Sequence, residues 1–101
     1  MAIDIFREGD DRRTAQPRFS LEQGSHETLH DQVWSAVERR AGVYVDPYGS
    51  TVLERTHIEL VVSLMELSFK AHRPNQNQAE LLRFLKAELS GGVNALIFFG
   101  D

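Results

Sequence analysis

The chain is organised around one stretch, Thr56-His-Ile-Glu-Leu-Val-Val-Ser-Leu-Met-Glu-Leu-Ser-Phe69, in which apolar residues fall on nearly every side of a helix. A surface helix keeps its apolar residues on one face, whereas a helix with this distribution is buried by several neighbours. Pro74 follows shortly after, where a helix must end because proline has no backbone N–H to donate. We therefore predict a core helix over residues 56–72, with the other elements packed around it.

A second helix is predicted over residues 75–90, on the C-terminal side of the core helix. Asn75 or Asn77 can cap its start, and Gly91-Gly92 stops it. Its apolar residues recur at helical spacing and share one face, which comprises Leu81, Leu82, Leu85 and Leu89.

A third helix is predicted over residues 26–41. Ser25 is a suitable N-cap, because a serine hydroxyl accepts a hydrogen bond from a free N–H of the first helical turn. Gly42 follows the last residue, which is typical of helix C-termini. Trp34 lies at the edge of the apolar face, which consists of Leu29, Val33, Ala36, Val37 and Ala41.

Three short segments have the pattern of β-strands. Residues 2–6 and 19–22 contain alternating apolar and polar residues, as half-buried strands do. Residues 93–99 are apolar on both faces after Asn94, so we expect an interior strand covered by helices.

Residues 43–53 predict a β-hairpin. β-Branched and aromatic residues flank Asp46-Pro-Tyr-Gly49, where Asp at the first position, Pro at the second and Gly at the fourth fit a type I turn. We expect a positive φ at Gly49 to close this hairpin.

The fold class that follows is α+β, with one small domain over residues 1–101 and a mostly antiparallel sheet packed by the three helices. A chain of 101 residues has room for one modest core. Its hydrophobic content of 42% and charged content of 26% are ordinary for a folded domain.

Composition also narrows the function classes. A net charge of -4 and a pI of about 5.5 argue against a nucleic-acid partner, which requires clustered Lys and Arg. Cysteine is absent, which fits a reducing compartment, and the start of the chain lacks the pattern of a secretory signal. No apolar stretch approaches the roughly 20 residues of a membrane span. We expect a cytoplasmic protein that binds neither membrane nor nucleic acid.

The stretch His26-Glu-Thr-Leu-His30 matches the zinc motif H-E-x-x-H, in which two imidazoles bind one metal and the Glu polarises its water. The surroundings are polar, whereas this helix is buried in zinc peptidases. The extended motif fails, because Val33 and Ala36 stand where Gly and His are required. A third ligand would have to come from His57, Glu54, Glu59 or Asp46. We expect no metal site and no cofactor, and keep zinc binding by His26 and His30 as an alternative.

Other chemistry-bearing residues form no catalytic motif. His57 and Asp46 could make an acid/base pair, but no nucleophile motif accompanies them, and a packing role for His57 is the simpler interpretation. Trp34 and Tyr44 are expected to pack in the core. Tyr48, near Asp46 at the tip of the turn, is the candidate for an exposed protein-binding anchor.

The segment from Gly42 to Leu53, followed by His57-Ile-Glu-Leu60, resembles small uncharacterised bacterial proteins with a strand, a D-x-Y-G-[DS]-T turn and a helix. Some of these proteins look like immunity proteins of bacterial toxin systems. The resemblance covers less than a third of the chain, and Ser50 stands where an acidic residue is most common. It implies a binding inhibitor and assigns no catalytic residue.

The function we expect is a non-enzymatic protein-binding module, an immunity-like inhibitor whose acidic surface meets a basic partner and whose binding residues are Asp46 and Tyr48. A minimal zinc hydrolase using residues 26–30, with Glu27 as base, is one alternative. A structural or regulatory homo-oligomeric subunit is another, since Leu96-Ile-Phe-Phe99 could supply an exposed strand edge.

Overall fold

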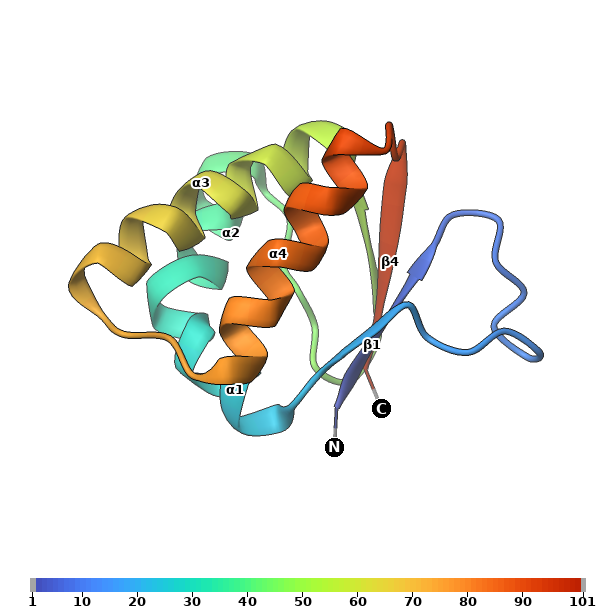
Figure 1. The fold of residues 1–101 in the computed structure, drawn as a ribbon, viewed down its shortest axis with the longest axis horizontal. Coiled ribbons are helices and arrows are strands. Elements are labelled where there is room, and N and C mark those ends of the chain that lie inside the picture. Colours follow the sequence, from blue (N-terminus) through green and yellow to red (C-terminus); the bar gives the residue numbers. More distant parts are fainter. Residues whose placement is uncertain (1, 101) are drawn as a thin grey trace.

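A four-stranded antiparallel sheet and a layer of helices on one of its faces make up the structure, a computed structural model that describes residues 2–100 (Figure 1). The strands are β1 (Ile3–Arg7), β2 (Phe19–Leu21), β3 (Ser50–Glu54) and β4 (Ala95–Gly100). Their order in the sheet is β2-β1-β4-β3, and each neighbouring pair is antiparallel. The predicted α+β class is confirmed.

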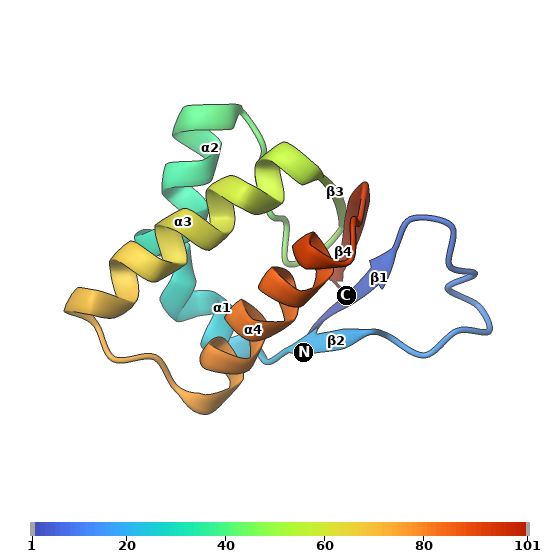
Figure 2. The same ribbon diagram turned by 45° about the horizontal axis from the view of Figure 1, so that its top comes forward.

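The helices lie where the sequence predicted them (Figure 2). The first runs from Gln23 to Ala41 and consists of α1 (Gln23–Leu29), a π-helical turn η1 (His30–Trp34) and α2 (Ser35–Ala41). The others are α3 (Arg55–Ala71) and α4 (Gln76–Ser90). No helix in residues 2–100 is both long and apolar enough to cross a membrane.

Helix α3 is the core helix, as predicted, and contacts α4, α2, η1, β3 and β4. Its inward residues Ile58, Val61 and Met65 are fully buried. Burial is one-sided, however, because Leu67 on its outer side is 63% exposed. The nearly all-round apolar pattern therefore overstated how completely α3 is covered.

The predicted hairpin over 43–53 is wrong. Residues 43–46 form no strand, and β3 pairs with β4 instead, from Ser50 opposite Phe99 to Glu54 opposite Ala95. Residues 43–46 are linked to β3 by the Thr51 side chain and not by backbone pairing. The Thr51 hydroxyl donates to the Tyr44 carbonyl at 3.1 Å and accepts from the Asp46 N–H at 3.2 Å. Strand β3 thus pairs with β4, which is distant in the sequence, and not with the adjacent residues 43–46.

The turn over residues 46–49 is present without the predicted backbone strain. The Gly49 N–H donates to the Asp46 carbonyl at 3.5 Å, the hydrogen bond that often closes a type I turn. Within residues 2–100, the glycines with positive φ are Gly9, Gly42 and Gly92, so the expected positive φ at Gly49 is wrong. Gly49 is instead short of space, because an added Cβ would lie 2.9 Å from Asp46 Oδ2.

Strand β4 lies in the middle of the sheet, hydrogen-bonded to β1 on one side and β3 on the other. The exposed edge predicted for Leu96–Phe99 is therefore wrong. Leu96 and Phe98 are buried, but Phe99 is 39% exposed, so helices do not cover both faces as expected. The Arg12 guanidinium carbon lies 5.0 Å from the centroid of the Phe99 ring on this outer face.

An ion pair attaches the end of β1 to α4. Arg7 Nε and Nη2 donate to the two carboxylate oxygens of Glu88 at 2.7 and 2.8 Å. The Glu88 side chain is only 8% exposed, so this bidentate pair satisfies a carboxylate that burial would otherwise penalise.

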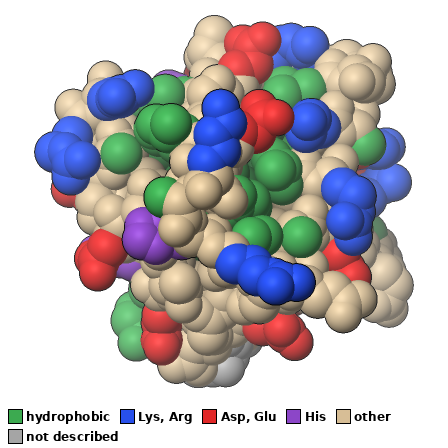
Figure 3. Space-filling model, turned by 60° about the vertical axis from the view of Figure 1, so that its left-hand side comes forward, with side chains coloured by type: hydrophobic (Ala, Val, Ile, Leu, Met, Phe, Trp, Pro, Cys, Tyr) green, Lys and Arg blue, Asp and Glu red, His purple; other side chains and the backbone are tan. Residues whose placement is uncertain are grey.

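On the helical side, cationic and anionic side chains are interspersed and form no continuous basic area (Figure 3).

Candidate functional site

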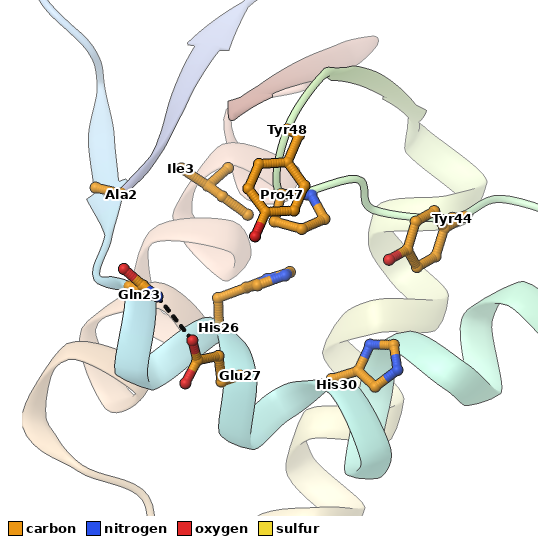
Figure 4. A pocket seen from close by; sticks show the side chains of 9 residues that line it. All are labelled: Ala2, Ile3, Gln23, His26, Glu27, His30, Tyr44, Pro47 and Tyr48. Carbon is orange, nitrogen blue, oxygen red and sulfur yellow. Dashed lines mark hydrogen bonds between the residues drawn. The ribbon is translucent and has the colours of Figure 1, made fainter. Parts of the chain in front are cut away.

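A pocket of about 330 Å³ opens between α1 and the turn that precedes β3 (Figure 4). It joins the two stretches that drew attention in the sequence, His26–His30 and residues 46–49. The start of β1 closes one side. Its lining residues are Ala2, Ile3, Gln23, His26, Glu27, His30, Tyr44, Pro47 and Tyr48.

Contacts with the start of α4 fix the position of α1 beneath the pocket. The prediction of Ser25 as N-cap is wrong, because α1 begins at Gln23 and Glu22 is its N-cap. The buried Ser25 hydroxyl instead hydrogen-bonds the Asn75 side chain, and Gln78 Nε2 donates to the Ser25 carbonyl at 3.1 Å. Asn75 is the N-cap of α4 and forms a capping box with Gln78, as the sequence allowed.

His26 forms the inner wall of the pocket. Its ring stacks on Trp34 with 6.1 Å between centroids, and Trp34 meets Phe98 edge to face at the same centroid distance. Trp34 is fully buried, so its predicted packing in the core is confirmed, but it does not lie at the edge of the apolar face. The π-helical turn explains this difference, because its extra residue per turn places both Val33 and Trp34 towards the core.

Burial keeps His26 uncharged. The residue is 5% exposed, and its Nδ1 has no hydrogen-bond partner among the described residues. Burial lowers the pKa of His26 below its ordinary value of 6.5, and the neighbouring His30 lowers it further, whereas Glu27 acts in the opposite direction. A neutral imidazole therefore faces the pocket at neutral pH.

The opposite wall is the segment that carries Tyr44 and Tyr48. Tyr48 is 74% exposed and Tyr44 is 43% exposed, so the predicted core position of Tyr44 is wrong. His30 meets the Tyr44 ring edge to face at 6.3 Å between centroids. Both phenol groups extend from the turn segment towards the space beside His26 (Figure 4).

Gly100 holds this wall against the sheet. Its N–H donates to the Gly49 carbonyl at 2.8 Å, and an added Cβ would collide with the Pro47 carbonyl oxygen. Only glycine therefore lets the backbone of residues 46–49 approach β4 so closely.

Of the two predicted binding residues, only Tyr48 lines the pocket. The half-buried Asp46 side chain serves the turn, because its Oδ1 accepts a hydrogen bond from the Tyr48 N–H at 2.8 Å. Asp46 thus fixes the backbone at Tyr48. It does not pair with His57, whose Nδ1 is buried without a hydrogen-bond partner within residues 2–100.

The residues of the zinc alternative lie at the pocket. His26 and His30 both line the pocket from one stretch of helix, with Glu27 between them. Across residues 2–100, however, no group of three or more His, Asp or Glu side chains is arranged to hold a metal ion. The proposed third ligands His57, Glu54, Glu59 and Asp46 do not line this pocket.

The sequence missed the pocket itself and the part played by Tyr44, His30 and Gln23 in lining it. No local signal could have revealed them, because the pocket arises where α1 and the segment before β3 meet. Comparison of the chain with protein-family models, with curated proteins and with solved structures found no match.

Proposed function

We propose that this protein is a non-enzymatic module that binds another protein through the pocket and its rim of Tyr44 and Tyr48. The observation that carries the proposal is the combination of a 74% exposed tyrosine beside a pocket and a turn whose hydrogen bond fixes the backbone at that tyrosine. Exposed tyrosines are enriched at binding hot spots, because they offer large contact area with few rotatable bonds.

The rim is organised before any partner arrives. Asp46 bonds the Tyr48 N–H, Thr51 bonds residues 44 and 46, and Gly100 binds Gly49. An ordered surface loses less conformational entropy on association than a mobile loop would, so more of the contact energy appears as affinity.

Within this class we propose an immunity-like inhibitor of a bacterial toxin, acting in the cytoplasm on a basic partner. The support is threefold: the turn that resembles such proteins is the one that presents Tyr48, the net charge is -4, and the chain is free of cysteine. Opposite charges on the partner would accelerate association and make it sensitive to salt.

Pull-down from the native host, together with the identity of the neighbouring gene, tests this proposal. Tyr48→Ala should lose the captured partner while its stability stays within about 0.5 kcal/mol of the parent, as expected of an exposed aromatic. Leu67→Ala is the matched control, since Leu67 is 63% exposed on α3 and does not line the pocket. Equal capture by the parent and Tyr48→Ala would contradict the proposed surface, and a neighbouring metabolic gene would count against the toxin partner.

A zinc hydrolase is the second candidate, because His26, Glu27 and His30 line one pocket. Metal analysis of untagged protein and thermal melts with added zinc separate it from the binding module. Bound zinc, or a melting temperature that rises with zinc and loses this rise in His30→Gln, would favour the hydrolase. Protein without zinc and with an unchanged melt would remove it.

A further inference from the structure

We infer that the pocket receives a basic side chain of the protein partner, a lysine or an arginine. This inference rests on the proposed function and specifies the chemistry of the bound group. The alkyl stem would lie against Ile3 and Pro47, and the cationic head would lie beside the tyrosine hydroxyls, with the Glu27 carboxylate across His26 on the Gln23 side of the pocket (Figure 4).

Charge selects a cation. Among the lining residues within 2–100, Glu27 is the only acidic side chain, and none of them is Lys or Arg. An anionic group would meet the Glu27 carboxylate and, among the described lining residues, no Lys or Arg. A cationic group gains from that carboxylate, whose Oε1 accepts from Gln23 Nε2 at 2.8 Å.

The hydrogen-bond acceptors of the pocket also favour a cationic group. Ammonium and guanidinium groups only donate hydrogen bonds, so their site must offer acceptors. Neither the Tyr44 nor the Tyr48 hydroxyl is hydrogen-bonded within residues 2–100, and both extend into the space beside His26 (Figure 4). Their oxygens can accept from the cation, and their electron-rich rings attract it further.

The apolar part of the lining suits the stem of the same side chain. Lys and Arg bury their methylene groups along apolar surface while the charged head reaches polar atoms. Ile3, Pro47 and Ala2 provide such a surface next to the tyrosines.

The protonation state of His26, which forms the inner wall of the pocket, makes binding depend on pH. Four titratable groups lie around His26 in the pocket: Glu27 and His30 from the same helix, and Tyr44 and Tyr48 from the segment before β3. Its other neighbours carry no charge, since β1 contributes the apolar Ile3 and η1 contributes Trp34. A neutral His26, whose pKa burial lowers below 6.5, leaves room for a cation, whereas a protonated His26 would repel it. Affinity for a basic side chain should therefore fall as the pH is lowered.

Titrations followed by NMR test the inference with N-acetyl-lysine methylamide and N-acetyl-arginine methylamide as probes. N-acetyl-norleucine methylamide keeps the stem without the charge, and N-acetyl-glutamate methylamide reverses the charge. At about pH 7.5, where free histidine is neutral, a basic probe should shift the Tyr44, Tyr48 and His26 signals at roughly threefold lower concentration than norleucine, and glutamate should shift none.

Glu27→Gln should lower the affinity for the basic probe several-fold. Glu59→Gln, at an exposed position outside the pocket, should leave this affinity unchanged. Lowering the pH to about 5.5 should weaken binding, and His26→Gln should reduce this loss. Equal binding of norleucine, preferred binding of glutamate, no shift with either basic probe, or affinity unchanged between the two pH values would overturn the inference. Loss of the captured partner in Tyr48→Ala would still support the proposed function in each of these cases.

Discussion

At the scale of single residues, glycines act through two distinct physical effects. Gly42 ends α2 in the left-handed conformation at φ 71°, where a Cβ is penalised. Gly49 has no such conformation, but an added Cβ would lie 2.9 Å from the Asp46 carboxylate. A side-chain oxygen can rotate away, whereas backbone strain cannot be relieved so easily.

Gly42→Ala should therefore lower the free energy of unfolding by about 1 kcal/mol, and Gly49→Ala should lower it by less. Gly24→Ala is the control, because Gly24 lies within α1 with open space around it. Alanine favours helix over glycine, so this variant should be more stable than the parent by roughly 0.5 kcal/mol. Urea melts of the three proteins would establish the order, and a larger loss in Gly49→Ala than in Gly42→Ala would contradict it.

His26 makes stability depend on pH. Its pKa in the folded state is lowered from the ordinary value of 6.5, chiefly by burial, so the unfolded chain binds the proton more readily. The contribution of His26 is fully present above about pH 6.5 and is lost as the pH falls from there towards the folded-state pKa. Melts between pH 8 and pH 5 should show this decline. His26→Gln should flatten it, whereas His72→Gln at an exposed position should leave it unchanged.

At the scale of elements, the start of α4 stabilises more than its own helix. Asn75 caps α4 through the Gln78 N–H at 2.8 Å and also hydrogen-bonds the buried Ser25 of α1. The neighbouring Asn77 accepts from the Glu22 N–H and donates to the Ser20 carbonyl. The position of His26 in the pocket therefore depends on residues some fifty positions later in the chain.

Asn75→Ala should cost about 1 to 2 kcal/mol, at or above the usual loss of a helix cap, because a bond to Ser25 disappears as well. Gln76→Ala should change stability by less than about 0.5 kcal/mol, since the exposed Gln76 side chain bonds, within residues 2–100, the Glu80 side chain of the same helix and no other element. Denaturant melts compare the two. A loss in Asn75→Ala no greater than in Gln76→Ala would show that the link between α1 and α4 contributes nothing.

At the scale of the whole molecule, stability should be distributed around β4 and α3. Strand β4 is hydrogen-bonded along both sides, and α3 contacts more elements than any other helix in the described part of the chain. The connection over residues 8–18 leaves the sheet and is held there mainly by exposed bonds such as Arg18 with Asp10.

Amide hydrogen exchange should accordingly be slowest in β4 and the buried side of α3 and fastest in residues 8–18. The reason is that β4 amides exchange only when the sheet opens, whereas the connection opens without loss of core contacts. Exchange measured by NMR at neutral pH would rank the segments. Protection of β4 no greater than that of β2 would contradict the central role of this strand.

Local pattern by itself determined the α+β class, the three helical segments, and the strands near both ends of the described chain. Helical periodicity, the cap at Asn75 and the stops at Gly42 and Gly91-Gly92 are encoded within a few residues, so they can be recognised without the fold. The protein partner, the immunity-like role and the absence of a metal stay predictions.

Tertiary structure alone decided the partner of β3, the place of β4 and the existence of the pocket. The hairpin over 43–53 satisfied every local preference, yet pairing with β4 buries Leu53 and Phe98 in the core, and no local rule contains that contact. Tyr44 came to the surface for the same reason, since residues 43–46 were displaced from the sheet. Long-range burial outweighs local turn chemistry here, because removing large apolar side chains from water is worth more than the bonds of one turn.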